Sequence, residues 1–202
     1  MMKRKFLVFL VAVLLLSLAV STLAGCGQSA KPEVETDQPT VYHSLEDSLS
    51  VMPAFEATDL EGNPVDESIF ENADITVVNC WGTFCTPCID ELPDLAEWAK
   101  EMPDNVQIVG IVCDYNEGWE GEANIRQAKQ ICEEAGVDFV QIVPDKALQE
   151  IQLGILVYPT TFFVDNSGRV VGEIIEEANI EKYKEEVTSY LENQSNEVQD
   201  HA

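Results

Sequence analysis

One eight-residue stretch, Trp81 to Cys88 (WGTFCTPC), constrains this chain more than any other feature. An apolar run from Ile75 to Cys80 precedes its C-x-x-C motif, and an amphipathic helical pattern from Ile89 to Met102 follows it. The order strand, C-x-x-C, helix places two thiols at a helix N-terminus, where unpaired N–H groups and the helix dipole favour a thiolate. We therefore predict thiol–disulfide exchange, with Cys85 as the exposed nucleophile and Cys88 as the resolving thiol.

The charge balance excludes one class of partner. The chain has 202 residues, with 11 Lys and Arg against 37 Asp and Glu, and a formal net charge of -26. Nucleic acid and anionic lipid surfaces repel such a chain, so no nucleic-acid partner is expected. We interpret the acidic residues as a solvated surface that keeps the protein soluble. The alternative is an acidic face that selects a basic protein partner.

The N-terminus has the pattern of a targeting segment. Met1 to Lys5 is basic, and the apolar run from Phe6 to Val20 is shorter than the roughly 20 residues that a membrane-spanning helix needs. Leu23-Ala24-Gly25-Cys26 follows and resembles the lipobox of bacterial lipoproteins. That resemblance implies a lipoprotein signal peptide over residues 1–25 and acylation of Cys26, which would anchor the protein to the membrane. The alternative is an ordinary signal peptide with an incidental cysteine. Both place the mature protein outside the cytoplasm, where disulfides persist.

The rest of the chain predicts one domain between two polar segments. Residues 26–51 are polar and acidic without periodicity, which predicts a flexible tether. Residues 52–192 form the predicted domain, and residues 193–202 a disordered tail. The expected elements are a hairpin at 55–65, a helical turn at 68–71, strands at 75–80, 106–112, 138–143, 160–164 and 169–175, and helices at 86–102, 122–135, 146–152 and 179–192. This order predicts an α/β layered fold.

Four features together resemble the thioredoxin superfamily: the Trp81–Cys88 motif, Pro93 in the following helix, Tyr158-Pro159-Thr160-Thr161, and the turn at Asp165–Gly168. Three further features are similar to those of the ResA/TlpA-like subfamily: the N-terminal hairpin, the insertion between Cys113 and Val137, and the lipobox. The members of this subfamily are membrane-anchored extracytoplasmic thiol–disulfide oxidoreductases. The resemblance implies a thioredoxin fold, with a central mixed β-sheet flanked by helices. It also implies an N-terminal β-hairpin extension and an insertion after the second core strand.

The resemblance assigns roles to residues beyond the cysteine pair. Pro159 matches the cis-proline that packs beside the disulfide and presents backbone to an incoming peptide; the alternative is a trans proline at the start of a strand. Glu91 matches a carboxylate near the cysteines. It lies three residues after Cys88, on the same helix face, and would exchange a proton with Cys88 if buried; the alternative is a solvated acid that only offsets the helix dipole. Three aromatic residues are expected to line the substrate groove: Trp81, Phe84 and Tyr158.

Three cysteines remain outside the motif and the lipobox: Cys80, Cys113 and Cys132. Three is odd, so at least one is free or pairs between molecules. They are interpreted as small buried hydrophobic side chains. The alternative is a Cys80–Cys113 bridge or an accessory thiol relay behind the site, because these residues end adjacent strands of the implied fold. No metal site and no cofactor besides the redox-active disulfide are expected, since a second C-x-x-C is missing and both histidines lie in the presumed tether and tail.

The expected function is reduction of a cysteine pair on an extracytoplasmic protein. A membrane electron donor of the thiol–disulfide type would recharge the site, and cytochrome c maturation is the use that the resemblance implies. The same chemistry run as an oxidant is the alternative. Two other classes fit less well: a peroxiredoxin-type peroxidase, which uses a lone cysteine in a Thr-x-x-Cys context, and a non-enzymatic binding lipoprotein. The expected location is the outer side of a bacterial cell membrane.

Overall fold

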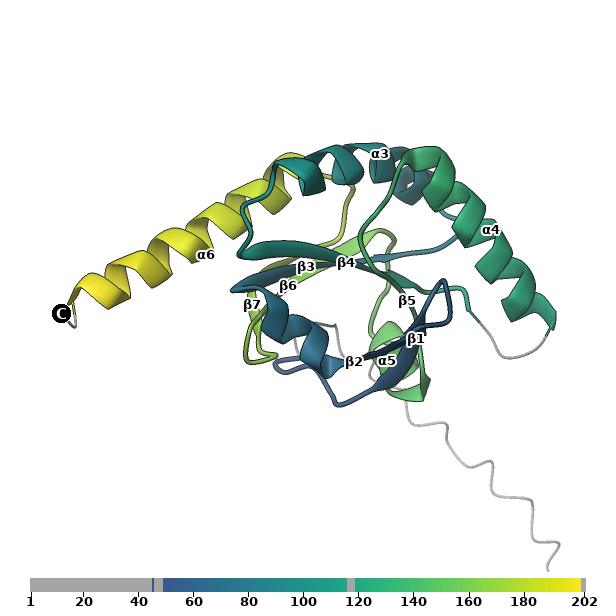
Figure 1. Ribbon diagram of the computed structural model, residues 1–202, viewed down its shortest axis with the longest axis horizontal. Coiled ribbons are helices and arrows are strands. Elements are labelled where there is room, and N and C mark those ends of the chain that lie inside the picture. The colour runs from purple at the N-terminus through teal and green to yellow at the C-terminus, as the bar shows by residue number, and fades with distance from the viewer. Residues whose placement is uncertain (1–44, 46–48, 116–118, 201–202) are drawn as a thin grey trace, which may run out of the picture. The chain divides into compact units, whose positions relative to one another are not determined.

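A computed structural model describes residues 45, 49–115 and 119–200 of the chain (Figure 1). The predicted signal peptide, Cys26 and most of the predicted tether lie outside these residues. Within them, no helix is both long and apolar enough to cross a membrane.

The elements follow the predicted order. The strands are β1 (Glu56–Asp59), β2 (Pro64–Asp66), β3 (Ile75–Trp81), β4 (Val106–Val112), β5 (Gln141–Val143), β6 (Thr160–Asp165) and β7 (Val170–Ile175). The helices are the 3₁₀ helix η1 (Glu67–Asn72) and the α-helices α3 (Thr86–Glu101), α4 (Trp119–Ala135), α5 (Lys146–Gln152) and α6 (Ile180–Asp200).

One seven-stranded sheet joins the strands in the order β2-β1-β5-β4-β3-β6-β7. Strands β3, β4 and β5 are parallel, whereas β6 runs antiparallel to β3 and β7 antiparallel to β6. The hairpin β1–β2 extends the other edge, where β1 pairs with β5. This arrangement confirms the expected mixed sheet with an N-terminal hairpin. Helix α4 is the expected insertion after the second core strand, β4.

Helices cover both faces of the sheet, so the central strand is buried along its whole length. Helices α3, α4 and α6 lie on one face, and η1 and α5 on the other (Figure 1). Every residue of β3 is buried, as its nearly continuous apolar sequence predicts. Successive residues of β3 point to opposite faces. As a result, Trp81 packs in the core under α3, and Cys80 in the core on the opposite face.

Ordered packing begins before Met52, earlier than the sequence predicted. Leu45 and Leu49 are 3% and 9% exposed and join the core on the α5 side of the sheet. Val51 forms a β-bridge with Arg169, and the N–H of Met52 donates to the carbonyl of Gly168 at 2.8 Å. Two isolated leucines among polar residues give no periodic pattern, which is why the prediction placed them in the tether.

Two helices are longer than predicted. Helix α4 begins at Trp119, before the predicted start at residue 122. Helix α6 continues to Asp200, through residues predicted as part of a disordered tail. Its side chains from Glu192 to Asn196 are exposed, so they carry no apolar pattern from which a helix could be predicted.

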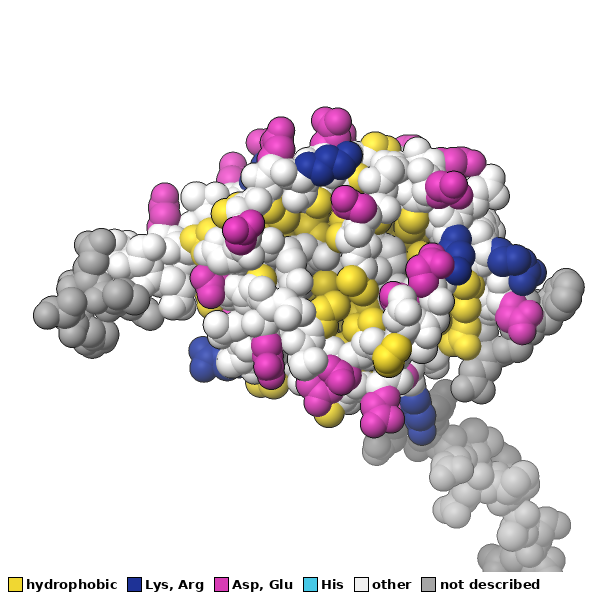
Figure 2. Space-filling view, in the orientation of Figure 1, with side chains coloured by type: hydrophobic (Ala, Val, Ile, Leu, Met, Phe, Trp, Pro, Cys, Tyr) yellow, Lys and Arg dark blue, Asp and Glu magenta, His cyan; other side chains and the backbone are white. Residues whose placement is uncertain are grey.

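Figure 2 shows acidic side chains spread over one face of the molecule, with few Lys and Arg among them.

Candidate active site

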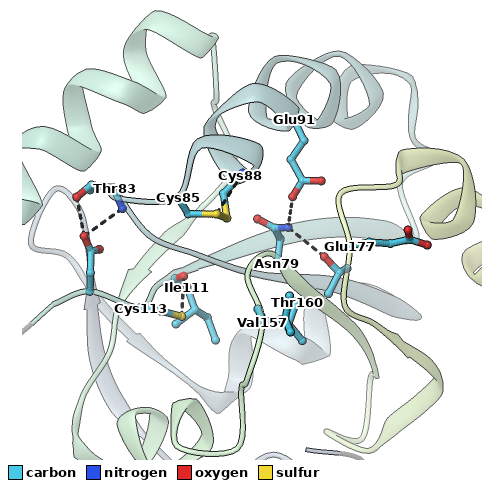
Figure 3. The surroundings of a disulfide bond; sticks show 12 residues. Asn79, Thr83, Cys85, Cys88, Glu91, Ile111, Cys113, Val157, Thr160 and Glu177 are labelled. Carbon is cyan, nitrogen blue, oxygen red and sulfur yellow. Dashed lines mark hydrogen bonds between the residues drawn. A yellow bond between two sulfur atoms is a disulfide. The ribbon is translucent and has the colours of Figure 1, made fainter.

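Cys85 and Cys88 form a disulfide at the N-terminus of α3 (Figure 3). Cys85 is the N-cap residue, and its sulfur accepts a hydrogen bond from the N–H of Cys88 at 3.3 Å. Pro87 lies in the first turn, where a missing N–H costs nothing. Cys85 is 6% exposed and Cys88 is fully buried. Cys85 is thus the more accessible residue of the pair, but it is buried and not exposed as predicted, because it packs in the apolar cluster beneath α3.

The loop before the disulfide is held by an aspartate from the end of the neighbouring strand. One carboxylate oxygen of Asp114 accepts hydrogen bonds from the N–H of Thr83 at 3.0 Å and from its hydroxyl at 2.6 Å. In the same loop, the ring of Phe84 lies over Gly82, where a Cβ would meet it at 2.6 Å. A side chain at position 82 would therefore displace Phe84. The sequence prediction did not include Asp114 in the site.

Glu91 is buried beside the disulfide and is only 5% exposed. Its Oε1 accepts a hydrogen bond from the Asn79 amide at 2.9 Å, and its Oε2 one from the Tyr183 hydroxyl at 3.2 Å (Figure 3). Burial raises the pKa of Glu91 to about 7, although these two hydrogen bonds act in the opposite direction. A buried carboxyl near neutrality fits the proton carrier expected from the sequence better than the solvated acid.

Asn79 and Tyr183 are the parts of this network that the sequence prediction missed. Asn79 lies in the middle of β3 and also donates to the Thr161 hydroxyl on β6 at 3.0 Å. Tyr183 comes from α6 and is fully buried. An amide side chain in a mostly apolar strand was the only signal for Asn79. Tyr183 had none, because a tyrosine in an acidic helix fits ordinary packing.

The loop before β6 presents the other wall of the site. The Tyr158–Pro159 peptide bond is cis, as the resemblance implied. The rings of Tyr158 and Phe84 pack edge to face with centroids 5.8 Å apart. Phe84 is 66% exposed, and the adjoining Leu156 and Val157 are 63% and 46% exposed. Exposed apolar side chains next to a reactive group are typical of a surface that binds a protein partner.

Trp81 lies inside the fold rather than in the groove. It is fully buried, and its indole N–H donates to Oε1 of Gln141 at 2.7 Å. The Gln141 side chain has room in this position because its pairing partner on β4 is Gly110, which has no side chain. A Cβ at residue 110 would lie only 2.1 Å from the Gln141 amide oxygen. Trp81 therefore supports the loop from below. Of the three aromatic residues proposed for the groove, Phe84 and Tyr158 are the two that meet at the surface.

The AhpC/TSA family model matches residues 50–172. The chain belongs to the AhpC/TSA family. Thiol-disulfide oxidoreductase ResA of Bacillus cereus is 30% identical over 155 residues, which cover 74% of this chain and 82% of that protein. ResA of Bacillus anthracis is 31% identical over 141 residues, covering 69% of this chain and 73% of that protein.

Solved structures show the same fold. The thioredoxin domain of a thiol-disulfide oxidoreductase from Bacteroides vulgatus is 26% identical, with a TM-score of 0.50 over 61% of this chain and 84% of that one. StoA from Bacillus subtilis is 20% identical, with a TM-score of 0.52 over 68% of this chain and 98% of that one. The thioredoxin fold is thus confirmed. Together with the relatives, the disulfide at a helix N-terminus identifies the chain as a thiol–disulfide oxidoreductase.

Proposed function

We propose that this protein reduces disulfide bonds of extracytoplasmic proteins. The Cys85 thiolate attacks a substrate disulfide and forms a mixed disulfide; Cys88 then attacks Cys85, releases the reduced substrate, and leaves the Cys85–Cys88 disulfide. Pro159, Phe84 and Tyr158 contact the substrate chain. The redox-active disulfide is the only reacting group that this exchange requires.

The buried carboxyl of Glu91 is the observation that supports reduction of the substrate over its oxidation. An oxidising pair needs a strongly stabilised thiolate in its reduced form. Here the sequence offers no Lys, Arg or His within ten residues of either cysteine, and Glu91 adds negative charge as it ionises. Both features disfavour a thiolate at Cys88 and so favour the disulfide form of the pair. The protein therefore tends to give electrons away. Glu91 accepts the Cys88 proton as that thiol becomes the attacking group.

The cellular setting of the proposal rests on the sequence. A signal peptide over residues 1–25 and a lipid on Cys26 hold residues 52–192 at the outer face of the bacterial membrane through the tether. A membrane donor of the thiol–disulfide type returns electrons to Cys85–Cys88. Apocytochrome c is the substrate class that the resemblance implies, because its cysteines must be reduced before haem attachment.

A reduction potential distinguishes reductase from oxidase. The protein is equilibrated with defined dithiothreitol mixtures, and the fraction of Cys85–Cys88 disulfide is measured by alkylation and mass spectrometry. We expect a potential below about -200 mV; a value well above it supports the oxidase. A Cys88→Ser variant should trap a mixed disulfide through Cys85, and a Cys85→Ser variant should not. Peroxide consumption by the reduced protein would instead support the peroxidase.

A further inference from the structure

The last residues of the predicted tether are bound to the domain. The N–H of Val170 donates to the carbonyl of Ser50 at 3.0 Å, which attaches this segment to the edge strand β7. Just upstream, the N–H of Leu49 donates to the carbonyl of Leu45 at 2.9 Å. The Leu45 side chain is buried, so this residue has a fixed place in the domain. The reaction described above uses none of these residues.

Leu45 packs against the substrate loop, residues 153–159, which joins α5 to β6. A Cβ at Gly154 would lie 3.4 Å from Cδ1 of Leu45 and 3.6 Å from its Cα, so Leu45 lies directly over this glycine. The next residue, Ile155, is buried in the same core cluster as Leu45. Ile155 is thus the inward anchor of the loop, and Leu45 covers the residue before it.

The same loop presents apolar side chains to solvent beside the disulfide. Leu153, Leu156 and Val157 are exposed on either side of the buried anchor. Figure 3 draws Val157 among the residues around Cys85 and Cys88. Exposed side chains have little packing of their own, so their positions follow from the backbone that carries them. That backbone rests on the buried contacts at residues 154 and 155.

We propose that Leu45 is a positioning residue for substrate binding. Its contact with Gly154 holds the substrate loop in the conformation that receives a protein chain beside the Cys85–Cys88 disulfide. Without the Leu45 side chain the loop is less constrained, and substrate binding must then also order it, which weakens the binding. The proposal rests on the proposed exchange with a protein substrate. It places part of the support of the substrate site before residue 52, in the segment that leads to the anchor.

The position of Leu45 separates this role from the chemistry of the sulfurs. Leu45 and Ile155 belong to the core on the α5 side of the sheet. Cys85 and Cys88 belong to the core under α3, on the opposite face. Truncation of Leu45 should therefore leave the surroundings of both sulfurs unchanged. A small thiol such as dithiothreitol reacts with the disulfide without binding the loop, so its rate measures the sulfurs alone.

The dependence of the exchange rate on substrate concentration tests this role. The probe is a synthetic peptide with a disulfide-bonded C-x-x-C-H sequence, the pattern of haem attachment in c-type cytochromes. The full-length chain is reduced, freed of reductant and mixed with excess oxidised peptide, and oxidation of Cys85–Cys88 is followed by acid quenching and alkylation. In Leu45→Ala the half-saturating peptide concentration should rise roughly three- to tenfold, with the same plateau rate. The rate of reduction of its disulfide by dithiothreitol should also stay the same.

Two matched variants control for the size and the place of the change. Leu45→Met keeps an apolar side chain of similar volume and should retain the wild-type half-saturating concentration. Val51→Ala truncates an exposed residue of the same segment and should have no effect. Gly154→Val disturbs the contact from the loop side and should act like Leu45→Ala. The double variant should show less than the product of the two single effects, because both changes disturb one contact.

Urea unfolding shows whether each variant is folded under the assay conditions, and Gly154→Val and Leu45→Val give the same test if Leu45→Ala is not. A half-saturating concentration that stays at the wild-type value overturns the proposal. So does a dithiothreitol rate that falls together with the peptide rate, since the effect would then lie at the sulfurs. The proposed function is tested separately by trapping the same peptide on a Cys88→Ser variant. A trapped peptide with unchanged saturation in Leu45→Ala refutes the positioning role alone.

Discussion

The hydroxyl oxygen of Tyr183 lies 3.2 Å from Oε2 of Glu91, although the two residues are 92 positions apart in the chain. The same hydroxyl lies 2.6 Å from the carbonyl oxygen of Glu177. A tyrosine has one hydroxyl proton, so it can donate to only one of these acceptors. If the Tyr183 proton is donated to the Glu177 carbonyl, a protonated Glu91 can donate its own proton to the Tyr183 oxygen. Tyr183 therefore accommodates both protonation states of the carboxyl, as a proton carrier requires.

Replacing Glu91 by Gln should remove a pH dependence of stability. The pKa of Glu91 is raised from 4.5 to about 7 in the folded protein. The folded state therefore binds more protons than the unfolded state between these values, so stability falls as pH rises through about 7. The loss is on the order of 3 kcal/mol. Urea unfolding of the oxidised protein at a series of pH values measures it. Glu91→Gln should flatten the profile, and the exposed neighbour variant Asp90→Asn should leave it unchanged. An unchanged profile in Glu91→Gln would contradict the assignment.

A Tyr183→Phe variant should move the titration of Glu91 to higher pH. The hydrogen bond from Tyr183 lowers the pKa of Glu91. Without this hydrogen bond, burial raises the pKa of Glu91 further. The inflection of the stability profile should therefore lie above 7. The variant should also lose about 1–3 kcal/mol of stability, because the Glu177 carbonyl and Glu91 lose a partner. Thr188→Ala, on the exposed side of the same helix, is the control for the stability loss. An inflection that stays at its wild-type pH would show that Tyr183 does not act on Glu91.

The sequence predicted the parts of the fold that local patterns specify. The strands around Val78 and Val109 are mostly apolar runs, and C-x-x-C followed by a helical pattern defines the start of α3. The supporting polar residues could not be predicted, because only the tertiary fold brings them together. Gln141 reaches Trp81 from 60 positions away, and Tyr183 reaches Glu91 from another helix. Leu45 and Leu49 were missed because two leucines among polar residues leave no sustained periodic pattern.

Removing the carboxylate of Asp114 should loosen the active-site loop. Asp114→Ala leaves the N–H and hydroxyl of Thr83 without their acceptor, so the unfolding free energy should fall by about 1–3 kcal/mol. The control is Asp104→Ala, which replaces an exposed aspartate just before β4. It should change the unfolding free energy by less than about 0.5 kcal/mol. In a double-mutant cycle, Thr83→Val should cost about 1 kcal/mol alone and nothing further in the Asp114→Ala background. Additive losses would mean that the two side chains act independently.

Truncating Phe84 should weaken recognition of a protein substrate without slowing the disulfide itself. Phe84 is 66% exposed and packs on Tyr158 at the mouth of the site, so Phe84→Ala should lower stability by no more than about 1 kcal/mol. An exposed aromatic side chain at the centre of a contact surface contributes strongly to binding. We expect KM for a protein disulfide to rise roughly tenfold, a loss of ~1.4 kcal/mol, while the rate of reduction by dithiothreitol stays unchanged. Phe84→Tyr should retain the wild-type KM, and Val140→Ala, an exposed apolar residue on another part of the fold, should have no effect. A rate with dithiothreitol that falls together with protein reduction would place the role of Phe84 in the reactivity of Cys85 instead of in substrate binding.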